Sequence, residues 1–555
     1  MEERRRHALI LATCSLSLFL TSLDGTIVNV ALPAIQRGLH TQIAGLEWVV
    51  DSYLLVLATL LLVSGATGDR IGRRRMFGTG LMIFIAGSLL CSLAPSIELL
   101  IAFRMVQAVG GSMLVPNSLS IITNTFTDAR RRAMAIGVWA GVFGVSAASG
   151  PVIGGLLVVG VGWRAVFWVT APVGALALFL SRRYLPESRA PHPRPIDVPG
   201  QLLMAACLAL VTYAIIEGPT TGWSSPRTLA LFGASAVLLA SFVAVERRAA
   251  APMLNLRFFR SPPFSGAVGI AVACSCMFAG FLFLSTLYLQ DSRRLSALMA
   301  GVAMLPATAV IAAVAPLSGR LVARWGSRPP LVAAGTLITA AAVILLQTNV
   351  TTPFWELAVA YLVLGAGFGL ANPPITNTAV SGMPRAQAGT AAGMASAARQ
   401  VGSVLGVALM GALTTSRYLA SIQDHLVRAG VPPGLRRVLV AAGPAVAARP
   451  VPGRGLTDRA AAVVRATFAV SAHAGWELAV VCGVIVVVTA LVTTGTRGRA
   501  AAVEVGRVME LEEGAASGAP VVSAPLVAPG AAPAHPPADL AATRPATSDI
   551  DQRER

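Results

Sequence analysis

Long apolar runs alternate with short charged segments along most of the chain. Each run approaches the roughly 20 residues that a helix needs to cross a bilayer core of about 30 Å. The pattern therefore predicts an all-α integral membrane protein with about 14 transmembrane helices. The expected spans are residues 8–32, 46–66, 77–95, 98–122, 134–158, 163–181, 199–218, 227–246, 264–290, 297–319, 329–348, 354–378, 388–416 and 470–494.

Arginine gathers in alternate connecting segments, at residues 70–75, 130–132, 182–194, 247–260 and 320–328. Loops on the cytoplasmic side of a membrane carry an excess of basic residues. We therefore expect these segments in the cytoplasm of a multi-pass cell membrane protein. An even number of spans then places both chain ends on the cytoplasmic side.

Residues 417–470 are predicted to form a large extracytoplasmic loop, although this stretch also contains arginines. A segment of this length crosses the membrane with little regard to its charge. The spacing of Leu426, Leu435 and Val438 indicates an interfacial helix within the loop.

Composition supports the membrane interpretation and narrows the function. The chain is 55% hydrophobic and 12% charged, whereas soluble domains are about 45–50% apolar and 25% charged. The arginines of the loops account for much of the net charge of +18, so no nucleic-acid partner is expected. All six cysteines lie in apolar runs without metal-ligand spacing, which predicts buried thiols and no metal site.

The chain contains no lysine. A P-loop ATPase is thereby excluded within this chain, because the Walker motif needs its lysine on the nucleotide phosphates. No hydrolytic constellation of residues is present either, so we expect neither an enzyme nor a cofactor. Energy for any transport must come from an ion gradient or from a separate subunit.

A charged island at residues 65–77, GATGDRIGRRRMF, separates two of the predicted spans. Its pattern G-x-x-x-D-R-x-G-R-R-R resembles the loop between the second and third spans of the major facilitator superfamily of secondary transporters. In that family the Asp and Arg residues clamp one helical bundle against the other and are released as the protein changes its open side. The resemblance implies gating residues rather than substrate ligands at Gly65, Asp69, Arg70, Gly72 and Arg73.

An internal repeat agrees with this resemblance. Residues 319–328 repeat the Gly, Arg, Gly and Arg of residues 65–74 at one offset, although Ala323 replaces the Asp. The facilitator architecture has two parallel six-helix halves related by an axis normal to the membrane. The expected organisation is a cytoplasmic N-terminus at 1–7, bundles at 8–181 and 264–494, a linker with two inserted helices at 182–263, and a disordered Ala- and Pro-rich cytoplasmic tail at 495–555.

The first span carries a carboxylate, Asp24, inside an apolar helix. Burying an acid there costs roughly 2.5–3.5 kcal/mol, which favours a functional role over simple packing against a polar neighbour. Residues 23–33, LDGTIVNVALP, resemble the first-span signature of the fourteen-span drug:proton antiporters. Because desolvation disfavours the charged form, we predict Asp24 as the principal proton carrier.

Arg104 and Gln107 in the fourth span resemble the family's R-x-x-Q motif. An arginine inside a span must find a carboxylate, a carbonyl or water, and Asp24 across the bundle is the expected partner. The alternative is that Arg104 lies near the end of its span and reaches the membrane surface.

The fifth span resembles the antiporter signature of facilitator exporters. Small residues one turn apart let helices approach closely, and the proline kinks the helix. Glycine-rich helices are common at membrane interfaces, so the GP-x-x-GG core is the specific part. The matching residues are Gly137, Gly150, Pro151, Gly154 and Gly155, with Ser146 in place of one glycine.

Five further polar residues within spans are weaker candidates for a substrate pocket. Asp51 and Glu217 lie within about two turns of the predicted outer ends, so an interfacial position is the favoured alternative for both. Arg399 lies near mid-span and is the better candidate. Asn29 and Gln107 complete the set.

Taken with the resemblance, these features predict a proton-coupled antiporter that exports small organic compounds, such as drugs or antibiotics. Its expected partners are the substrate, protons and the lipid bilayer, and a monomer is expected. An importer or uniporter on the same fold remains an alternative, as does a transport-dead sensor or channel. The sequence does not choose the substrate.

Overall fold

The computed structural model describes residues 2–190, 196–249, 252–381, 387–441 and 458–495, together with residues 383, 443 and 507. Almost all of the predicted tail lies outside the described residues. The described chain is built from helices. They are α1 (Glu2–Leu39), α2 (Ile43–Ile71), α3 (Arg73–Leu93), α4 (Ile97–Thr125), α5 (Ala129–Gly160), α6 (Ala165–Trp168), α7 (Thr170–Tyr184), α8 (Val198–Thr221), α9 (Pro226–Arg248), η1 (Leu256–Arg260), α10 (Pro262–Leu287), η2 (Tyr288–Ser292), α11 (Ala297–Trp325), α12 (Arg328–Leu345), α13 (Phe354–Val380), α14 (Ala388–Arg428), α15 (Pro433–Ala441), α16 (Asp458–Ser471) and α17 (His473–Thr493).

The prediction of an all-α membrane protein is confirmed. Within the described residues, 14 helical segments are long and apolar enough to span a bilayer. The sixth of these combines α6 and α7, the ninth combines α10 and η2, and the last combines α16 and α17. Most helices run beyond the apolar runs that predicted them, because helix continues into the polar segments at either end.

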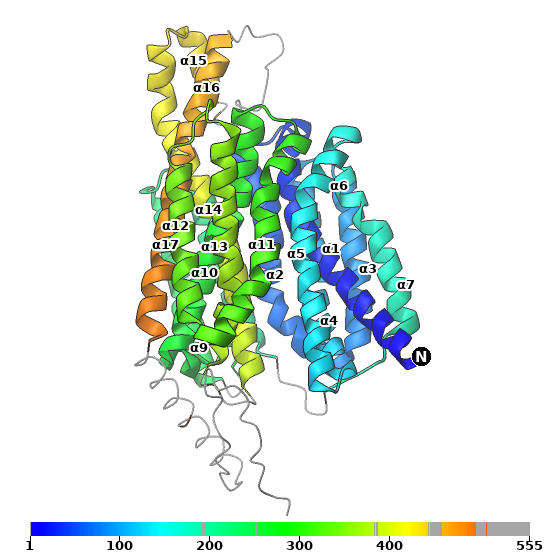
Figure 1. Ribbon diagram of the computed structural model, residues 1–555. Coiled ribbons are helices and arrows are strands. Elements are labelled where there is room, and N and C mark those ends of the chain that lie inside the picture. The colour runs from blue at the N-terminus through cyan, green and yellow to red at the C-terminus, as the bar shows by residue number, and fades with distance from the viewer. Residues whose placement is uncertain are drawn as a thin grey trace, which may run out of the picture.

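The spans form two bundles, seen side by side in Figure 1. Helices α1 to α7 pack among themselves, and α10 to α14 pack with α17. The inserted helices α8 and α9 pack against each other, and α8 also lies against both α2 and α14. Thus one inserted helix touches both bundles.

The near side is the side at which α1 begins and the α2–α3 turn lies. The far side is the opposite side, where α15 and α16 stand above the bundles in Figure 1.

The closest recorded contacts between the bundles lie in their far halves. An ideal Cβ on Gly155 of α5 would lie 2.5 Å from the Cα of Leu298 on α11. Gly301 of α11 likewise leaves room only for the carbonyl of Pro151. The amide Nε2 of Gln290 donates to the Val30 carbonyl of α1 at 2.9 Å. Backbone therefore meets backbone where the bundles close.

The internal repeat is visible in the backbone. Helices α2 and α11 have 29 residues each, and a glycine follows each of them, Gly72 and Gly326 respectively. Their φ angles of 117° and 78° lie in the left-handed region that only glycine enters without strain. The two halves thus make the same turn at the same place.

Helix α14 is longer than predicted and leaves the expected loop largely helical. The predicted span ended near residue 416, but α14 continues to Arg428, and α15 and α16 follow. Tyr418, Ile422 and Leu426 recur every fourth residue, are fully buried, and cluster with apolar residues of α15 and α16. Leu426 therefore belongs to α14, whereas Leu435 and Val438 belong to α15. The middle of the segment lies outside the described residues.

Candidate proton-coupling site

Asp24 lies in the interior of α1, where the apolar run of the sequence forms a continuous helix. Its side chain has 0% exposure and is flanked by buried Leu23, Ile27 and Val28. An isolated carboxylate in such surroundings would be strongly destabilised, so it needs nearby donors.

Helix α4 supplies these donors. The Arg104 guanidinium, 2% exposed, donates through Nη1 to Oδ2 of Asp24 at 2.6 Å. One turn further on, Gln107 donates through Nε2 to Oδ1 of Asp24 at 2.8 Å and accepts from Arg104 at 2.8 Å. The spacing R-x-x-Q thus places both donors on the helix face that meets Asp24.

Helix α2 completes the surroundings of Arg104. Nε of Arg104 donates to the Val49 carbonyl at 3.2 Å, and its guanidinium carbon lies 4.1 Å from the ring centroid of Tyr53. Arg104 is therefore enclosed by three helices and does not reach a membrane surface. We name Asp24, Arg104 and Gln107 the coupling cluster.

Chemically, the coupling cluster can hold Asp24 in two forms. While Arg104 and Gln107 donate to it, the carboxylate is charged and compensated. If a helix movement withdrew Arg104, a bare buried carboxylate would be very costly, and the group would take up a proton. A small displacement between α1 and α4 would thus load or unload a proton.

The gating loop is fastened to the segment that follows α7. Arg73 donates to Asp69 at 2.7 Å within the loop, and its backbone N–H donates to the Ser188 carbonyl at 3.0 Å. The Ala190 N–H donates to the Asp69 carbonyl at 3.0 Å, and Glu187 accepts from the Arg74 N–H at 3.1 Å. All of these contacts lie within the first bundle and the linker that follows it. The role of Asp69 and Arg73 as a clamp between the two bundles therefore remains a prediction. No pattern in the sequence predicted the Glu187 contact.

The other loop residues differ in surroundings. Arg70 is exposed, and Gly65 lies 3.5 Å, measured from an ideal Cβ, from Pro116 of α4. Gly72 disfavours a side chain because of its φ of 117°, and an ideal Cβ there would also lie 2.5 Å from a Glu187 carboxylate oxygen.

The glycines of α5 meet different neighbours on its two faces. Gly150 leaves room only for Thr26 of α1, and an ideal Cβ on Gly154 would lie 2.8 Å from Ile27. Gly155 faces α11, as described above. Ser146 donates to the Phe19 carbonyl of α1 at 2.7 Å. Gly137 has no atom within 4 Å of its ideal Cβ position.

Comparison with known proteins agrees with this architecture. Residues 14–407 match the family model described as Major Facilitator Superfamily. The chain belongs to the major facilitator superfamily.

Relatives within the superfamily are named for drug resistance. The chain is 38% identical to the multidrug resistance protein Stp of Mycobacterium tuberculosis, over 78% of this chain and 81% of that protein. It is 35% identical to the tetracenomycin C resistance and export protein of Streptomyces glaucescens, over 88% and 91% respectively.

A solved structure shows the same facilitator fold. A bacterial homologue of the human lysosomal transporter Spinster superposes with a TM-score of 0.62 at 18% identity, covering 88% of this chain and 97% of that one.

The motif of this facilitator's fifth span yields a matched pair of variants. Gly155→Val would force a branched side chain into the α11 backbone, and overpacking of this kind costs about 1–3 kcal/mol. We expect inserted protein with transport reduced about tenfold or more, since 1.4 kcal/mol is a factor of ten. Gly137→Val should transport normally because its site is open. Counterflow in proteoliposomes measures both, and equal rates would remove the close contact from the mechanism.

The weaker pocket candidates do not form one group with the coupling cluster, apart from Gln107. Asn29 donates to the Gly25 carbonyl at 2.8 Å, and its Oδ1 is buried without a partner. Arg399 on α14 donates to Ser396 at 2.7 Å, and its Nη1 is likewise buried without a partner.

Asp51 and Glu217 lie near a residue that the sequence did not single out, Glu47. Asp51 is fully buried, which does not fit an interfacial position. Glu47 and Asp51 lie one turn apart on α2, and Glu47 is within electrostatic range of Glu217 on α8. The available signal was a pair of acids four residues apart, but Glu47 lies at the very start of the predicted span 46–66.

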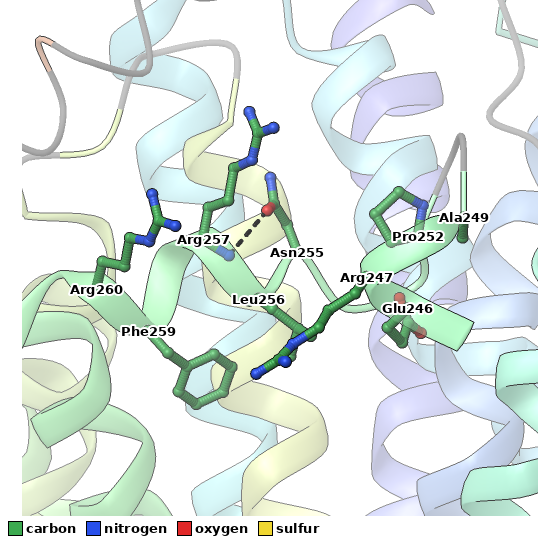
Figure 2. Close-up of a pocket in the computed structure, with 9 residues that line it drawn as sticks. All are labelled: Glu246, Arg247, Ala249, Pro252, Asn255, Leu256, Arg257, Phe259 and Arg260. Carbon is green, nitrogen blue, oxygen red and sulfur yellow. Dashed lines mark hydrogen bonds between the residues drawn. The ribbon is translucent and has the colours of Figure 1, made fainter. Parts of the chain in front are cut away.

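A cavity of about 730 Å³ lies at the near-side ends of α9 and η1. Figure 2 shows three arginines around it, Arg247, Arg257 and Arg260, with Glu246 beside them. None of its lining residues belongs to α1, α2 or α4. The cavity is therefore separate from the coupling cluster of this facilitator.

Proposed function

We propose that this facilitator exports small organic compounds from the cell in exchange for protons. The observation that carries the proposal is the coupling cluster, a buried carboxyl group that accepts from two donors of another helix. Relatives named for multidrug resistance and for tetracenomycin C resistance and export support the substrate class.

Coupling follows from the two forms of Asp24. A contact made in only one arrangement of the helices shifts the equilibrium between the arrangements. Protonation of Asp24 removes its attraction to Arg104, so the proton and the helix arrangement are linked. A proton crossing 100 mV carries about 2.3 kcal/mol, which supports roughly fifty-fold accumulation of substrate.

Flux in everted membrane vesicles tests the proposal. With an imposed pH gradient, vesicles with the protein should concentrate a lipophilic dye or antibiotic, and collapse of the gradient should release it. A channel or uniporter would only equilibrate the compound across the membrane. Uptake that does not respond to the gradient would reject proton coupling. Drug survival panels of cells with and without the protein identify the substrate.

The sidedness is part of the proposal. The near side carries the arginine-rich connections, which supports a cytoplasmic position for it and for the N-terminus. The active unit is proposed to be a monomer that needs no cofactor and is driven by the proton gradient.

Cysteine labelling checks the sidedness. Gln423 is exposed on the far-side part of α14, and Arg189 is exposed near the gating loop; the natural cysteines are buried. A membrane-impermeant maleimide should label Gln423→Cys in intact cells and Arg189→Cys only after permeabilisation. We also expect Gly453 to label from outside and the tail near Pro520 only after permeabilisation, but both positions lie outside the described residues. The reverse labelling pattern would overturn the orientation.

A further inference from the structure

Three carboxyl groups lie along the far half of the seam between α2, α8 and α14. Glu47 and Asp51 of α2 have exposures of 2% and 0%, and Glu217 of α8 is half-buried. Glu47 and Asp51 lie four residues apart on one face of α2, and helix α8, which carries Glu217, packs against α2. We call these three residues the acidic seam.

No cation compensates the acidic seam among the described residues. None of the ion pairs found there includes one of the three acids. Both carboxyl oxygens of Asp51 are buried and accept no hydrogen bond. Arg104 of the neighbouring α4 is held by Asp24, Gln107 and a carbonyl of α2.

The other elements packed on this part of α2 supply no charge that pairs with the three acids. Helix α8 adds Tyr213, whose hydroxyl accepts from Arg227 at 2.6 Å. Helix α14 has no titratable side chain between Arg399 and Arg417, and Arg417 pairs with Glu477 at 2.6 Å. Helix α1 contributes Asp24, which is committed to the coupling cluster, and Arg37 at its far end, which is exposed and forms no ion pair with the three acids.

A metal ion does not fit these acids. Among the residues that the structure describes, no three His, Cys, Asp or Glu side chains are arranged to hold one. The surroundings are instead apolar, with Ile215 and Ile216 of α8 against Ala408 and Ala412 of α14. Buried carboxyls that have neither cation nor donor are stable only when neutral. The ligand that fits is the proton.

Glu47 lies at a contact between the two bundles. Its carboxyl group lies directly against Gly411 of α14, where a side chain on the glycine would overlap it. Separation of α2 from α14 at the far side would therefore admit water to Glu47. In water the carboxyl group can ionise, and neighbouring negative charges would then oppose closure.

We propose that the acidic seam is a second proton-binding site, distinct from the coupling cluster, that keeps the far side closed while it is protonated. The proposal rests on the proposed function for its place in a transport cycle, but not for its chemistry. In that cycle, protons taken up from the far side would permit closure, and the inserted helix α8 would take part through Glu217.

Distances between spin labels test the proposal without a transport assay. Val161, at the far end of α5, and Gln423 of α14 are exposed on different bundles. Double electron–electron resonance on the full chain carrying both cysteines, in lipid nanodiscs, reports the opening of the far side. We expect a single short distance at mildly acidic pH and a shift towards a longer distance at mildly alkaline pH.

Variants assign that shift to the acidic seam. Glu47→Gln and Asp51→Asn keep shape but cannot ionise, so each should hold the short distance at alkaline pH. Glu98→Gln removes an exposed acid from the same side and should behave as wild type. Asp24→Asn should retain the shift, which separates a failure of this proposal from a failure of the coupling cluster. A wild-type distance that does not change with pH, or an unchanged shift in both Glu47→Gln and Asp51→Asn, would overturn the proposal.

Discussion

Asp24→Asn is expected to lose gradient-driven efflux completely while downhill exchange of substrate persists. Asparagine keeps the shape of Asp24, and its single side-chain oxygen can still accept from Arg104, so the fold should survive. It cannot exchange a proton, and the link between proton and helix arrangement is therefore broken. Accumulation should fall from roughly fifty-fold at 100 mV to none. Everted vesicles with and without a gradient measure the difference.

An exposed ion pair provides the control for Asp24→Asn. Glu477 and Arg417 form such a pair, and pairs in water contribute about 0–1 kcal/mol. Glu477→Gln should therefore accumulate substrate as wild type does. Substrate-induced proton release of wild-type size by Asp24→Asn vesicles would place the principal proton site elsewhere.

Disruption of the gating loop should stop transport without preventing insertion. Asp69→Asn and Arg73→Ala each remove the charge-assisted contact of 2.7 Å that joins α2 to α3. If that contact differs between the two arrangements of the bundles, a loss of about 1.4 kcal/mol changes their ratio tenfold. We expect at least a tenfold fall in transport rate, with near-normal substrate binding by scintillation proximity.

Arg75 is the matched control in the same loop. Its side chain is 70% exposed, and its ion pair with Glu187 is long, at 3.8 Å from Nε to the carboxylate oxygen. Arg75→Ala should therefore transport normally. Full transport by both Asp69→Asn and Arg73→Ala would exclude the loop pair from the mechanism.

The sequence predicted the coupling cluster because a charge in an apolar helix has few stable solutions. Asp24 needed a donor, Arg104 needed an acceptor, and the spacing to Gln107 fixed which helix face they share. The spans were predictable for a related reason, since a bilayer demands long apolar runs. Both inferences rest on the free-energy cost of placing a polar group in an apolar segment, which can be judged without the tertiary structure.

Other features depend on contacts that no local pattern reveals. Glu47 is buried because α8 and α14 cover it, and α8 is an insertion whose position the sequence leaves open. Glu187 became important through a backbone N–H far away in the chain. Helix α14 continues beyond its predicted span because Tyr418 and Ile422 pack against apolar residues of α15 and α16. These two helices follow α14 after a break in the apolar pattern.

The two bundles meet along two flanks, one at α2 and α14 and the other at α5 and α11. Helix α8 covers only the first of these flanks towards the lipid. It lies against both α2 and α14, so a compound dissolved in the bilayer meets a protein wall on that flank. Neither inserted helix packs on α5 or α11 in the described part of the chain, to judge from the helix pairs in contact. Entry from the membrane on the α5–α11 flank would therefore meet no inserted helix, but it would require α5 and α11 to separate where their backbones are in contact.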